Sequence, residues 1–282
     1  MNDAWRGHPR DERSGEPVEL DLTRPHGARV YDYFLGGKDN FDVDRAAAAA
    51  LEAALPDIPG MARANRDFMH RAVRRLVGTH GVRQVLDIGS GIPTRPNLHE
   101  IAQDLDPTAR VVYVDNDPIV TTHSRALLSS TPQGRVDFVL ADATDPAGVL
   151  ADSAIGQTLD LTEPVALMLV SVLMYFDDAE IRTVVDTLLD ALPSGSYLTI
   201  SHPTGDFAPE VIAGAVQVAR STGLTYNPRP RAEVEKLFSG VELVEPGVVA
   251  MPVWYPAVSD ITSDLDALSA STHYWVGMGR KR

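Results

Sequence analysis

Two glycines follow an apolar segment in VLDIGSGIPT, residues 85–94. Glycine lets the backbone turn tightly and approach a ligand, because no Cβ intervenes. A dinucleotide-binding loop carries a third glycine that packs a helix beneath the pyrophosphate. Here Ile92 and Pro93 stand at that point, and Pro93 delays the start of the helix. The loop therefore predicts a site for a bulkier, non-phosphate group, and its predicted ligand-binding residues are Asp87, Gly89, Ser90 and Gly91.

Carboxylates end the next two predicted strands. Asp115 closes VVYVD and is followed by Asn116, while Asp142 closes VDFVLAD and is followed by Ala143. A carboxylate at the first position accepts hydrogen bonds from both hydroxyls of a ribose, and one at the second accepts from an adenine amino group. Asp117, before a proline, is better explained as a helix N-cap.

Together these strand ends predict a site for adenosine without phosphates. The negative charge also suits a sulfonium cation, so the predicted cofactor is S-adenosylmethionine. Taken alone, the DxGxG pattern is weak, because glycines after a strand are often plain turns. A nicotinamide-dependent oxidoreductase is the alternative cofactor class, and Pro93 and the absent third glycine count against it.

Candidate side chains for methyl transfer lie at the ends of the fourth and fifth predicted strands. The reaction is an in-line displacement that needs alignment and exclusion of water, and it needs a base only when the acceptor loses a proton early. Ser171 and Tyr175 follow the fourth strand, where Ser171 is predicted to bind the cofactor and Tyr175 to take part in catalysis. His202 in TISHPTGD is the best candidate base. The structural alternatives are a histidine that hydrogen-bonds a loop and a tyrosine in the core.

A double glycine amid charged and aromatic residues marks ARVYDYFLGGKDNFDVDR, residues 28–45. One interpretation is a lid in which Arg29, Tyr31 or Lys38 contacts the carboxylate of the cofactor. The other is a short helix, YDYFL, that ends in a GGKDN turn. Both can hold.

The elements that position these residues follow from hydrophobic patterning. Helices are expected over 45–55 and 61–77, the second carrying Asn65 and Arg66 toward the same cavity. Apolar strands without alternation then alternate with helices, which predicts a doubly wound, mostly parallel α/β sheet covered on both faces. Two closing segments, VELVEPGVV and HYWVGMGRK, predict an antiparallel edge. The expected organisation is a disordered tail over 1–22, a helical extension or lid over 23–80 and the cofactor-binding domain over 81–282.

Composition narrows the function classes. The 282 residues contain no cysteine, which excludes disulfides and thiolate chemistry and fits a cytoplasmic protein. No apolar segment resembles a signal peptide or is long enough to cross a bilayer. The net charge of −14 disfavours nucleic acid as a partner and favours small or neutral substrates. The scattered histidines predict no metal site, and no oligomeric state follows from the sequence.

Three segments, LDIGSGIPT, VVYVDNDP and ARVYDYFLGGKDNFDVDR, resemble an actinobacterial family of S-adenosylmethionine-dependent methyltransferases, formerly a domain of unknown function. The resemblance runs from Ala28 to the terminal YWVGMGRK, and its GGKDNF block is the most family-specific part. It implies the class I methyltransferase (Rossmann-like) fold with an N-terminal helical extension near the cofactor. By that resemblance Gly89 and Gly91 line the methionine part, Asp115 the ribose, and Asp142 with Ala143 the adenine.

Two positions depart from the pattern of that family. Thr144 stands where an arginine is frequent, and Met174 and Tyr175 stand where a histidine is common. If these side chains matter for substrate, this member differs from its relatives or has lost activity. The predicted function is methyl transfer to an unidentified small-molecule acceptor, and the alternative is a non-catalytic S-adenosylmethionine-binding protein.

Overall fold

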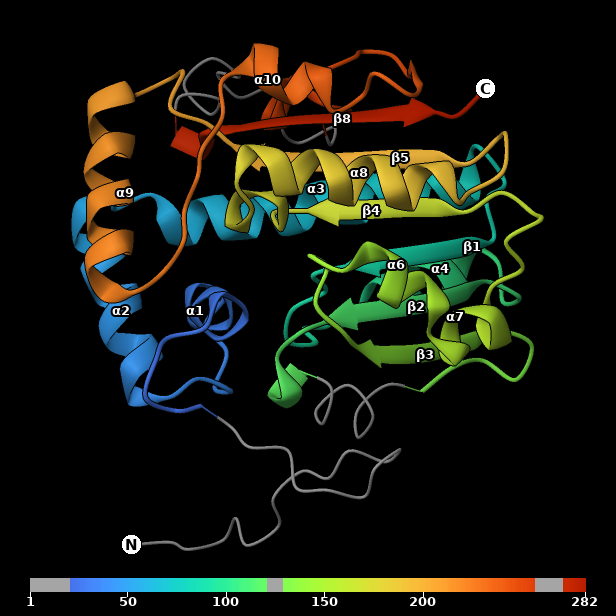
Figure 1. Ribbon diagram of the computed structural model, residues 1–282, viewed down its shortest axis with the longest axis horizontal. Coiled ribbons are helices and arrows are strands. Elements are labelled where there is room, and N and C mark those ends of the chain that lie inside the picture. The colour runs from blue at the N-terminus through green and yellow to red at the C-terminus, as the bar shows by residue number, and fades with distance from the viewer. Residues whose placement is uncertain (1–20, 121–128, 257–270) are drawn as a thin grey trace, which may run out of the picture.

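The protein is built around one twisted sheet, as the computed structural model shows (Figure 1). The structure describes residues 21–120, 129–256 and 271–282. In this part of the chain eight strands follow the order β3-β2-β1-β4-β5-β8-β6, with β7 paired to β8. The strands are β1 (Gln84–Ile88), β2 (Arg110–Asp115), β3 (Arg135–Leu140), β4 (Ala166–Val170), β5 (Tyr197–Pro203), β6 (Glu242–Leu243), β7 (Val249–Ala250) and β8 (Tyr274–Arg280).

Strands β1 to β5 pair with their neighbours in parallel. Strands β1 and β5 are buried along their whole length, as expected of parallel strands covered on both faces. The strand order reverses between β1 and β4, and in such sheets the crevice at the carboxyl ends beside this reversal is where ligands bind. The prediction of a doubly wound, mostly parallel sheet is confirmed.

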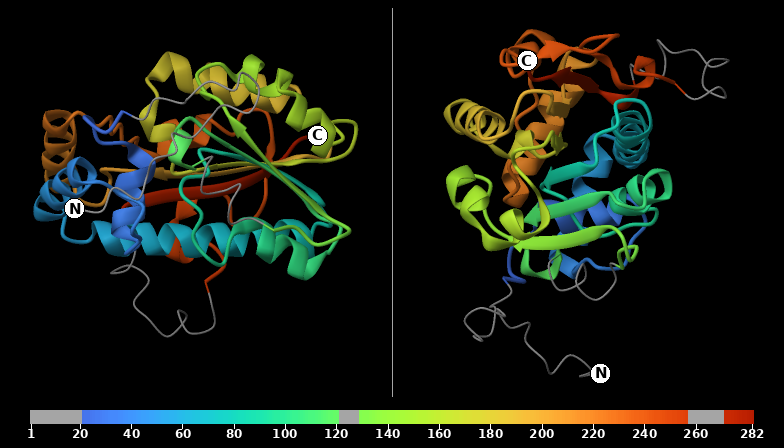
Figure 2. Two further views of the ribbon diagram at one scale, coloured as in Figure 1. Left: turned by 90° about the horizontal axis from the view of Figure 1, so that it is seen from below. Right: turned by 90° about the vertical axis from the view of Figure 1, so that its right-hand side faces the viewer.

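Helices cover both faces of the sheet (Figure 2). Successive residues of β1 enter opposite cores: Val85 belongs to the apolar cluster that includes Phe68 of one helix layer, and Leu86 to the cluster that includes Val184 of the other. The first layer contains α3 (Ile58–Gly78) and α4 (Leu98–Leu105), and the second contains α6 (Pro146–Ala151), α7 (Ser153–Thr158), α8 (Asp178–Asp190) and α10 (Arg231–Lys236).

Three helices gather at the carboxyl ends of the parallel strands. They are α1 (Gly27–Phe34), α2 (Asp42–Ala54) and α9 (Pro209–Thr222), seen at the left of Figure 1. A separate apolar cluster joins them, with Val30 and Phe34 from α1, Ala48 and Leu51 from α2 and Ala219 from α9. The N-terminal helices thus pack beside the crevice instead of forming an independent unit.

The C-terminal part of the sheet departs from the predicted elements. VELVEPGVV forms two short strands, because Pro246 cannot donate to a ladder and Gly247 turns the chain at φ 83°. Strand β8 runs antiparallel to β5 and lies between β5 and β6. Strand β4 ends at Val170, and the chain after it forms the short 3-10 helix η1 (Leu173–Tyr175). The tail expected over 1–22 lies outside the described residues except for its last two positions.

Candidate active site

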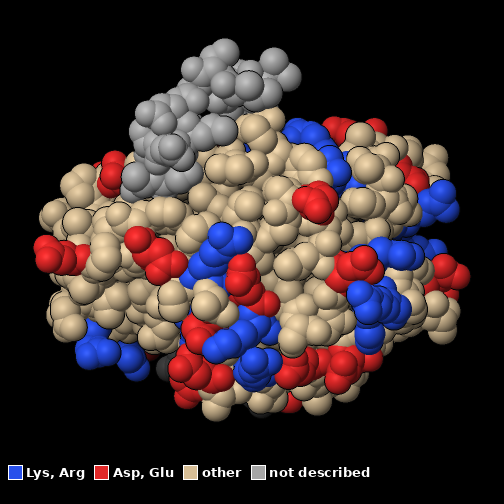
Figure 3. Space-filling view, turned by 90° about the horizontal axis from the view of Figure 1, so that it is seen from above, with Lys and Arg blue, Asp and Glu red and all other residues tan. Residues whose placement is uncertain are grey.

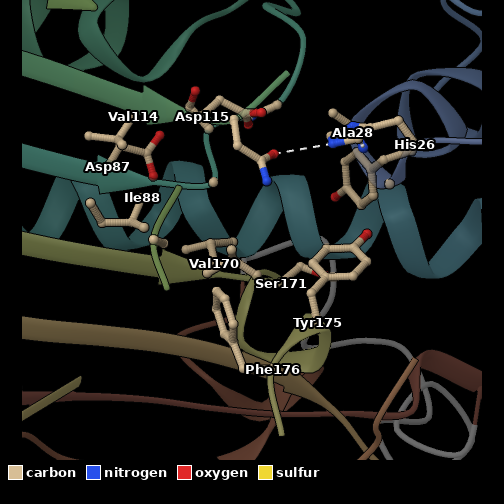
Figure 4. A pocket seen from close by; sticks show the side chains of 18 of the residues that line it. His26, Ala28, Asp87, Ile88, Val114, Asp115, Val170, Ser171, Tyr175 and Phe176 are labelled. Carbon is tan, nitrogen blue, oxygen red and sulfur yellow. Dashed lines mark hydrogen bonds between the residues drawn. The ribbon is translucent and has the colours of Figure 1, made fainter. Parts of the chain in front are cut away.

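A cavity of about 290 Å³ opens at the carboxyl ends of β1, β2, β3 and β4. Residues 25–28 and Tyr31 of the N-terminal segment line it from one side, and residues 223–225, after α9, line it as well. Figure 4 shows His26 and Tyr175 facing the strand ends across this space. We call this space the cofactor cavity. The predicted residues that line it are Tyr31, Asp87, Gly89, Ser90, Gly91, Asp115, Asn116, Asp142, Ala143, Ser171 and Tyr175.

The glycine loop is an open cradle. Gly89 has φ 70°, and a Cβ there would meet Cγ2 of Val172 at 2.3 Å. Gly91 has φ 66°, and a Cβ there would meet no atom within 4 Å. The Ser90 hydroxyl is buried without a hydrogen-bond partner in the described structure. Helix α4 begins only at Leu98, so the predicted delay of this helix is confirmed.

Asp115 ties this loop to the end of β2. Its carboxylate accepts from the amide of Gly91 at 2.8 Å and from the amide of Asp117 at 3.0 Å. The side chain is only 6% exposed, and burial raises its pKa. Each carboxylate oxygen keeps a second lone pair, so both can accept a further hydrogen bond from a ligand in the cavity.

Asp142 lies at the exposed rim. One of its oxygens accepts from the Thr144 amide at 2.9 Å and from the Thr144 hydroxyl at 2.8 Å. Thr144, at the position where relatives were expected to carry an arginine, therefore fixes the orientation of this carboxylate. The other oxygen remains able to accept from a ligand.

Asp87 and Arg66 bring opposite charges to the same cavity. Burial raises the pKa of Asp87 to about 7, against a lowering by Arg66 and a further raising by Asp115. The Arg66 guanidinium donates to the carbonyl oxygens of Thr94 and Pro96, the second at 3.0 Å, and burial lowers its pKa. The cavity can thus pair with both a cation and an anion of one ligand. The prediction that Asn65 and Arg66 face it is confirmed.

A hydrogen-bond chain seats α1 over the cavity. The Ser201 hydroxyl on β5 donates to Asn65 at 2.5 Å, and Asn65 donates to the Tyr31 hydroxyl at 3.0 Å. That hydroxyl in turn donates to the carbonyl of Ala62 at 2.9 Å. Burial raises the pKa of Tyr31, so its hydroxyl stays protonated at neutral pH. Tyr31 thus lines the cavity, and its predicted contact with the cofactor carboxylate stays a prediction.

The GGKDN segment is a turn that does not reach the cavity. Asp32 accepts from the amide of Asp39 at 3.0 Å and from the side chain of Asn40 at 2.8 Å. A Cβ at Gly37 would lie 1.9 Å from this carboxylate, so the turn requires glycine there. Lys38 is exposed and does not line the cavity, so its predicted contact with the cofactor is wrong. The turn interpretation of this segment holds.

Arg29 is also held away from the cavity. Its guanidinium lies 3.2 Å from Asp117 and 3.5 Å from Asp44, and all three side chains are buried. Its suggested contact with a cofactor carboxylate is therefore wrong. Asp117 accepts from the amide of Ile119 at 2.9 Å, as expected of an N-cap, and in addition anchors α1.

His202 lies in the core and does not line the cofactor cavity. Pairing with β8 continues to Pro203, so His202 is inside β5 and does not follow it. Its Nδ1 lies 2.9 Å from the Pro203 carbonyl, and its Nε2 accepts from Arg229 at 3.2 Å. Burial lowers its pKa to about 4, which keeps it neutral at pH 7. Its predicted role as the base is wrong, because it cannot touch a substrate.

His202→Leu is expected to lower the free energy of unfolding by about 1–3 kcal/mol, because buried hydrogen bonds are lost. Binding in the cofactor cavity should change less than about twofold. The unfolded histidine binds a proton near pH 6.5 and the folded one only near pH 4, so His202 makes wild-type stability fall on acidification. The variant should lack this component, which urea unfolding at pH 7 and pH 5 measures. A large loss of cofactor affinity in a folded variant would contradict the structural assignment.

Ser171 and Tyr175 form the wall after β4. Ser171 adopts φ 58°, an uncommon conformation for a residue with a side chain, and its hydroxyl lies 2.7 Å from that of Tyr274. A Cβ on Gly27 would lie 2.4 Å from the Tyr175 hydroxyl, so α1 packs directly on this ring. Neither contact was visible in the sequence, because Gly27 and Tyr274 reach the site only through folding. His26, which lies 3.2 Å from Asn116, was missed for the same reason (Figure 4).

The model of a family described as S-adenosyl methyltransferase matches residues 13–282. This chain belongs to that family. A DUF574 family protein from Streptomyces avermitilis is 44% identical, and its crystal structure superimposes with a TM-score of 0.89 over 94% of this chain and 100% of the other. A putative methyltransferase from Thermobifida fusca is 39% identical, and its crystal structure superimposes with a TM-score of 0.84 over 94% of this chain and 98% of the other. No curated protein matches the sequence.

The methyltransferase uses S-adenosylmethionine, and the cavity suits that molecule. The unpartnered Ser90 hydroxyl and the open space over Gly91 provide a cradle for it. The resemblance found in the sequence is thus confirmed for family, fold and cofactor. The GGKDNF block as a marker of the family stays a prediction, as do the individual roles of the site residues.

Cofactor affinity is expected to rise about tenfold from pH 6 to pH 8, because only ionised Asp87 attracts the cationic part of the cofactor. With its pKa raised to about 7, Asp87 is largely protonated at pH 6 and largely ionised at pH 8. Isothermal titration at both pH values tests this. The Asp87→Asn protein should bind the cofactor more weakly than wild type at pH 8 and should lack the tenfold difference in affinity between the two pH values. Any pH dependence that remains in this variant reports titration of the cofactor itself. An equal pH dependence in both proteins would remove Asp87 as the cause.

Proposed function

We propose that the methyltransferase acts on a small-molecule acceptor that enters between the N-terminal helices and the sheet. The observation that carries this proposal is the cover over the strand ends. Residues 25–28 and Tyr31 line the cofactor cavity together with residues 223–225, so the strand ends do not face an open surface. A folded macromolecule has no broad face to dock against there.

Surface charge supports the same acceptor class. The net charge of −14 repels phosphate backbones. On the face drawn in Figure 3, the described lysines and arginines are interspersed with aspartates and glutamates and form no continuous basic tract. Within the described ranges, no helix combines the length and hydropathy needed to cross a membrane.

The residues of the cavity hold distinct parts of the cofactor in this proposal. Arg66 pairs with the methionine carboxylate and Asp87 with the amino group. Asp115 accepts from the ribose hydroxyls, and Asp142 accepts from the adenine amino group at the rim. When bound, S-adenosylmethionine supplies a methyl group activated by its sulfonium charge.

The chain contributes alignment and exclusion of water to the reaction. Burial raises the pKa of Tyr175, as it does for Tyr31, so both hydroxyls keep their protons at neutral pH. Tyr175 therefore serves as a wall and a hydrogen-bond donor and does not remove a proton. This arrangement suits an acceptor that is already nucleophilic when it binds.

Methyl transfer from S-adenosylmethionine with a labelled methyl group tests the acceptor class. The enzyme is incubated separately with a low-molecular-weight cell extract, with total RNA and DNA, and with protein. We expect label in the small-molecule fraction alone, and much less of it with Asp115→Asn enzyme at the same concentration of S-adenosylmethionine. Label in nucleic acid or protein would overturn the proposal.

A further inference from the structure

A second cavity, of about 60 Å³, adjoins the cofactor cavity. Both are lined by Gly27, Tyr31, Tyr175, Leu224 and Thr225, which therefore mark the junction between them. The second cavity extends from this junction between α1, α2, α3 and α9, away from the glycine loop. We call it the tyrosine chamber, because Tyr31, Tyr175, Tyr226 and Tyr274 all line it.

The remaining walls of the tyrosine chamber are mostly apolar. Val30, Phe34, Leu51, Met61 and Ala219 contribute to them, and no charged side chain lines the chamber in the described part of the chain. This contrasts with the cofactor cavity, which carries three aspartates and an arginine. An ionised group in the chamber would lose its hydration without gaining a counter-charge, so the chamber excludes ions.

One tyrosine of the chamber carries a buried hydroxyl without a hydrogen-bond partner among the described residues. The Tyr31 hydroxyl is bonded to Ala62 and Asn65, and the Tyr274 hydroxyl to Ser171. The Tyr226 hydroxyl is buried and has no partner among the described residues. Burying a hydroxyl without a hydrogen bond is unfavourable, so a ligand group that bonds to it gains specificity.

We propose that the tyrosine chamber is the acceptor subsite and that the acceptor is an uncharged molecule. The acceptor buries a small apolar portion in the chamber, and its inner polar group hydrogen-bonds to the Tyr226 hydroxyl. This assignment rests on the proposed function, which it narrows from small molecules in general to neutral ones with an apolar end.

The size of the chamber sets the geometry of this binding. Its volume of about 60 Å³ is much smaller than the 290 Å³ of the cofactor cavity, so the chamber takes only a small part of an acceptor. The inner edge of a ring or a short alkyl group fills it. The rest of the acceptor then lies at the junction beside Tyr175, which is the side of the chamber that faces the cofactor cavity.

Fluorine NMR with small probes tests the assignment on protein saturated with S-adenosylhomocysteine. The probes are 4-fluorophenol, fluorobenzene and 4-fluorobenzoate, which differ in polar group and charge. We expect 4-fluorophenol to bind at least tenfold more tightly than 4-fluorobenzoate. Tyr226→Phe should weaken the binding of 4-fluorophenol about five- to tenfold and should change the affinity for fluorobenzene by less than about twofold.

A matched pair of variants locates the binding. Ala219 lines the tyrosine chamber but not the cofactor cavity, so Ala219→Val should abolish binding of both uncharged probes with unchanged affinity for S-adenosylhomocysteine. Ala213→Val, an exposed position on the same helix, should change neither. No probe binding, equal binding of the benzoate, or probe binding unaffected by both Tyr226→Phe and Ala219→Val would overturn the subsite.

Methyl transfer is a separate readout. Probe binding that behaves as expected, with label appearing only in a macromolecule, would contradict the proposed function. Labelled small molecules together with absent probe binding would contradict the chamber assignment alone.

Discussion

Asp115→Asn is expected to weaken binding of S-adenosylmethionine by about 30- to 1000-fold. In the proposed ribose contact, a carboxylate that accepts from two ligand hydroxyls is replaced by an amide that keeps one acceptor oxygen. The loss of charge-assisted hydrogen bonds amounts to about 2–4 kcal/mol. The amide nitrogen would also face one of the two backbone donors, Gly91 or Asp117, that the carboxylate now satisfies. Isothermal titration with S-adenosylmethionine and S-adenosylhomocysteine measures the effect.

Two variants separate this effect from a general change in charge. Asp186→Asn removes an exposed carboxylate on α8, away from the cavity, and should leave affinity unchanged. Asp142→Asn acts at the exposed rim and should weaken binding less than Asp115→Asn does. Unaltered affinity in a folded Asp115→Asn protein would remove this residue from the ribose site.

The strand-end residues of the site could be predicted because their signals are local. An apolar strand followed by glycine or aspartate is readable in a few residues, and the parallel sheet then brings Asp87, Asp115 and Asp142 to one edge. The positions of these three side chains in the cavity wall follow from that pattern alone. Their individual contacts with the cofactor remain proposals.

The rest of the site depends on packing between distant segments. Gly27 meets Tyr175, and Tyr226 reaches the tyrosine chamber, only after α1 and α9 have docked. His202 was misplaced for a related reason, since β8 lengthens β5 by pairing as far as Pro203. Neither effect leaves a mark in the neighbouring sequence.

The N-terminal segment shows how a distinctive motif can be structural. The charged residues beside a double glycine favoured the prediction of direct contact with the cofactor. In the structure they belong to a turn in which Asp32 accepts from the Asp39 amide and lies against Gly37. Arg29 forms an ion pair with Asp117, which connects this segment to the end of β2. The motif thus brings Tyr31 to the cavity and leaves its own charged residues outside.

Arg29→Met is therefore expected to lower the free energy of unfolding by about 3–5 kcal/mol, because it leaves Asp44 and Asp117 buried without their counter-charge. The guanidinium also donates to the carbonyls of Asp21 and Arg24 at 3.3 and 3.2 Å, and these bonds are lost with it. Loosening of α1 withdraws Tyr31 from the cavity, so cofactor affinity should fall as well. Urea unfolding and isothermal titration measure the two effects.

Arg63→Met, at an exposed arginine on α3, controls for the loss of a positive charge and should change stability by less than about 0.5 kcal/mol. Adding Asp117→Asn to Arg29→Met should recover part of the lost stability, because one of the two uncompensated carboxylates is removed. Recovery of stability without recovery of cofactor binding would mean that α1 must be held by the ion pair itself. A fully stable Arg29→Met protein with wild-type affinity would instead show that the apolar cluster around Val30 and Phe34 suffices to seat α1.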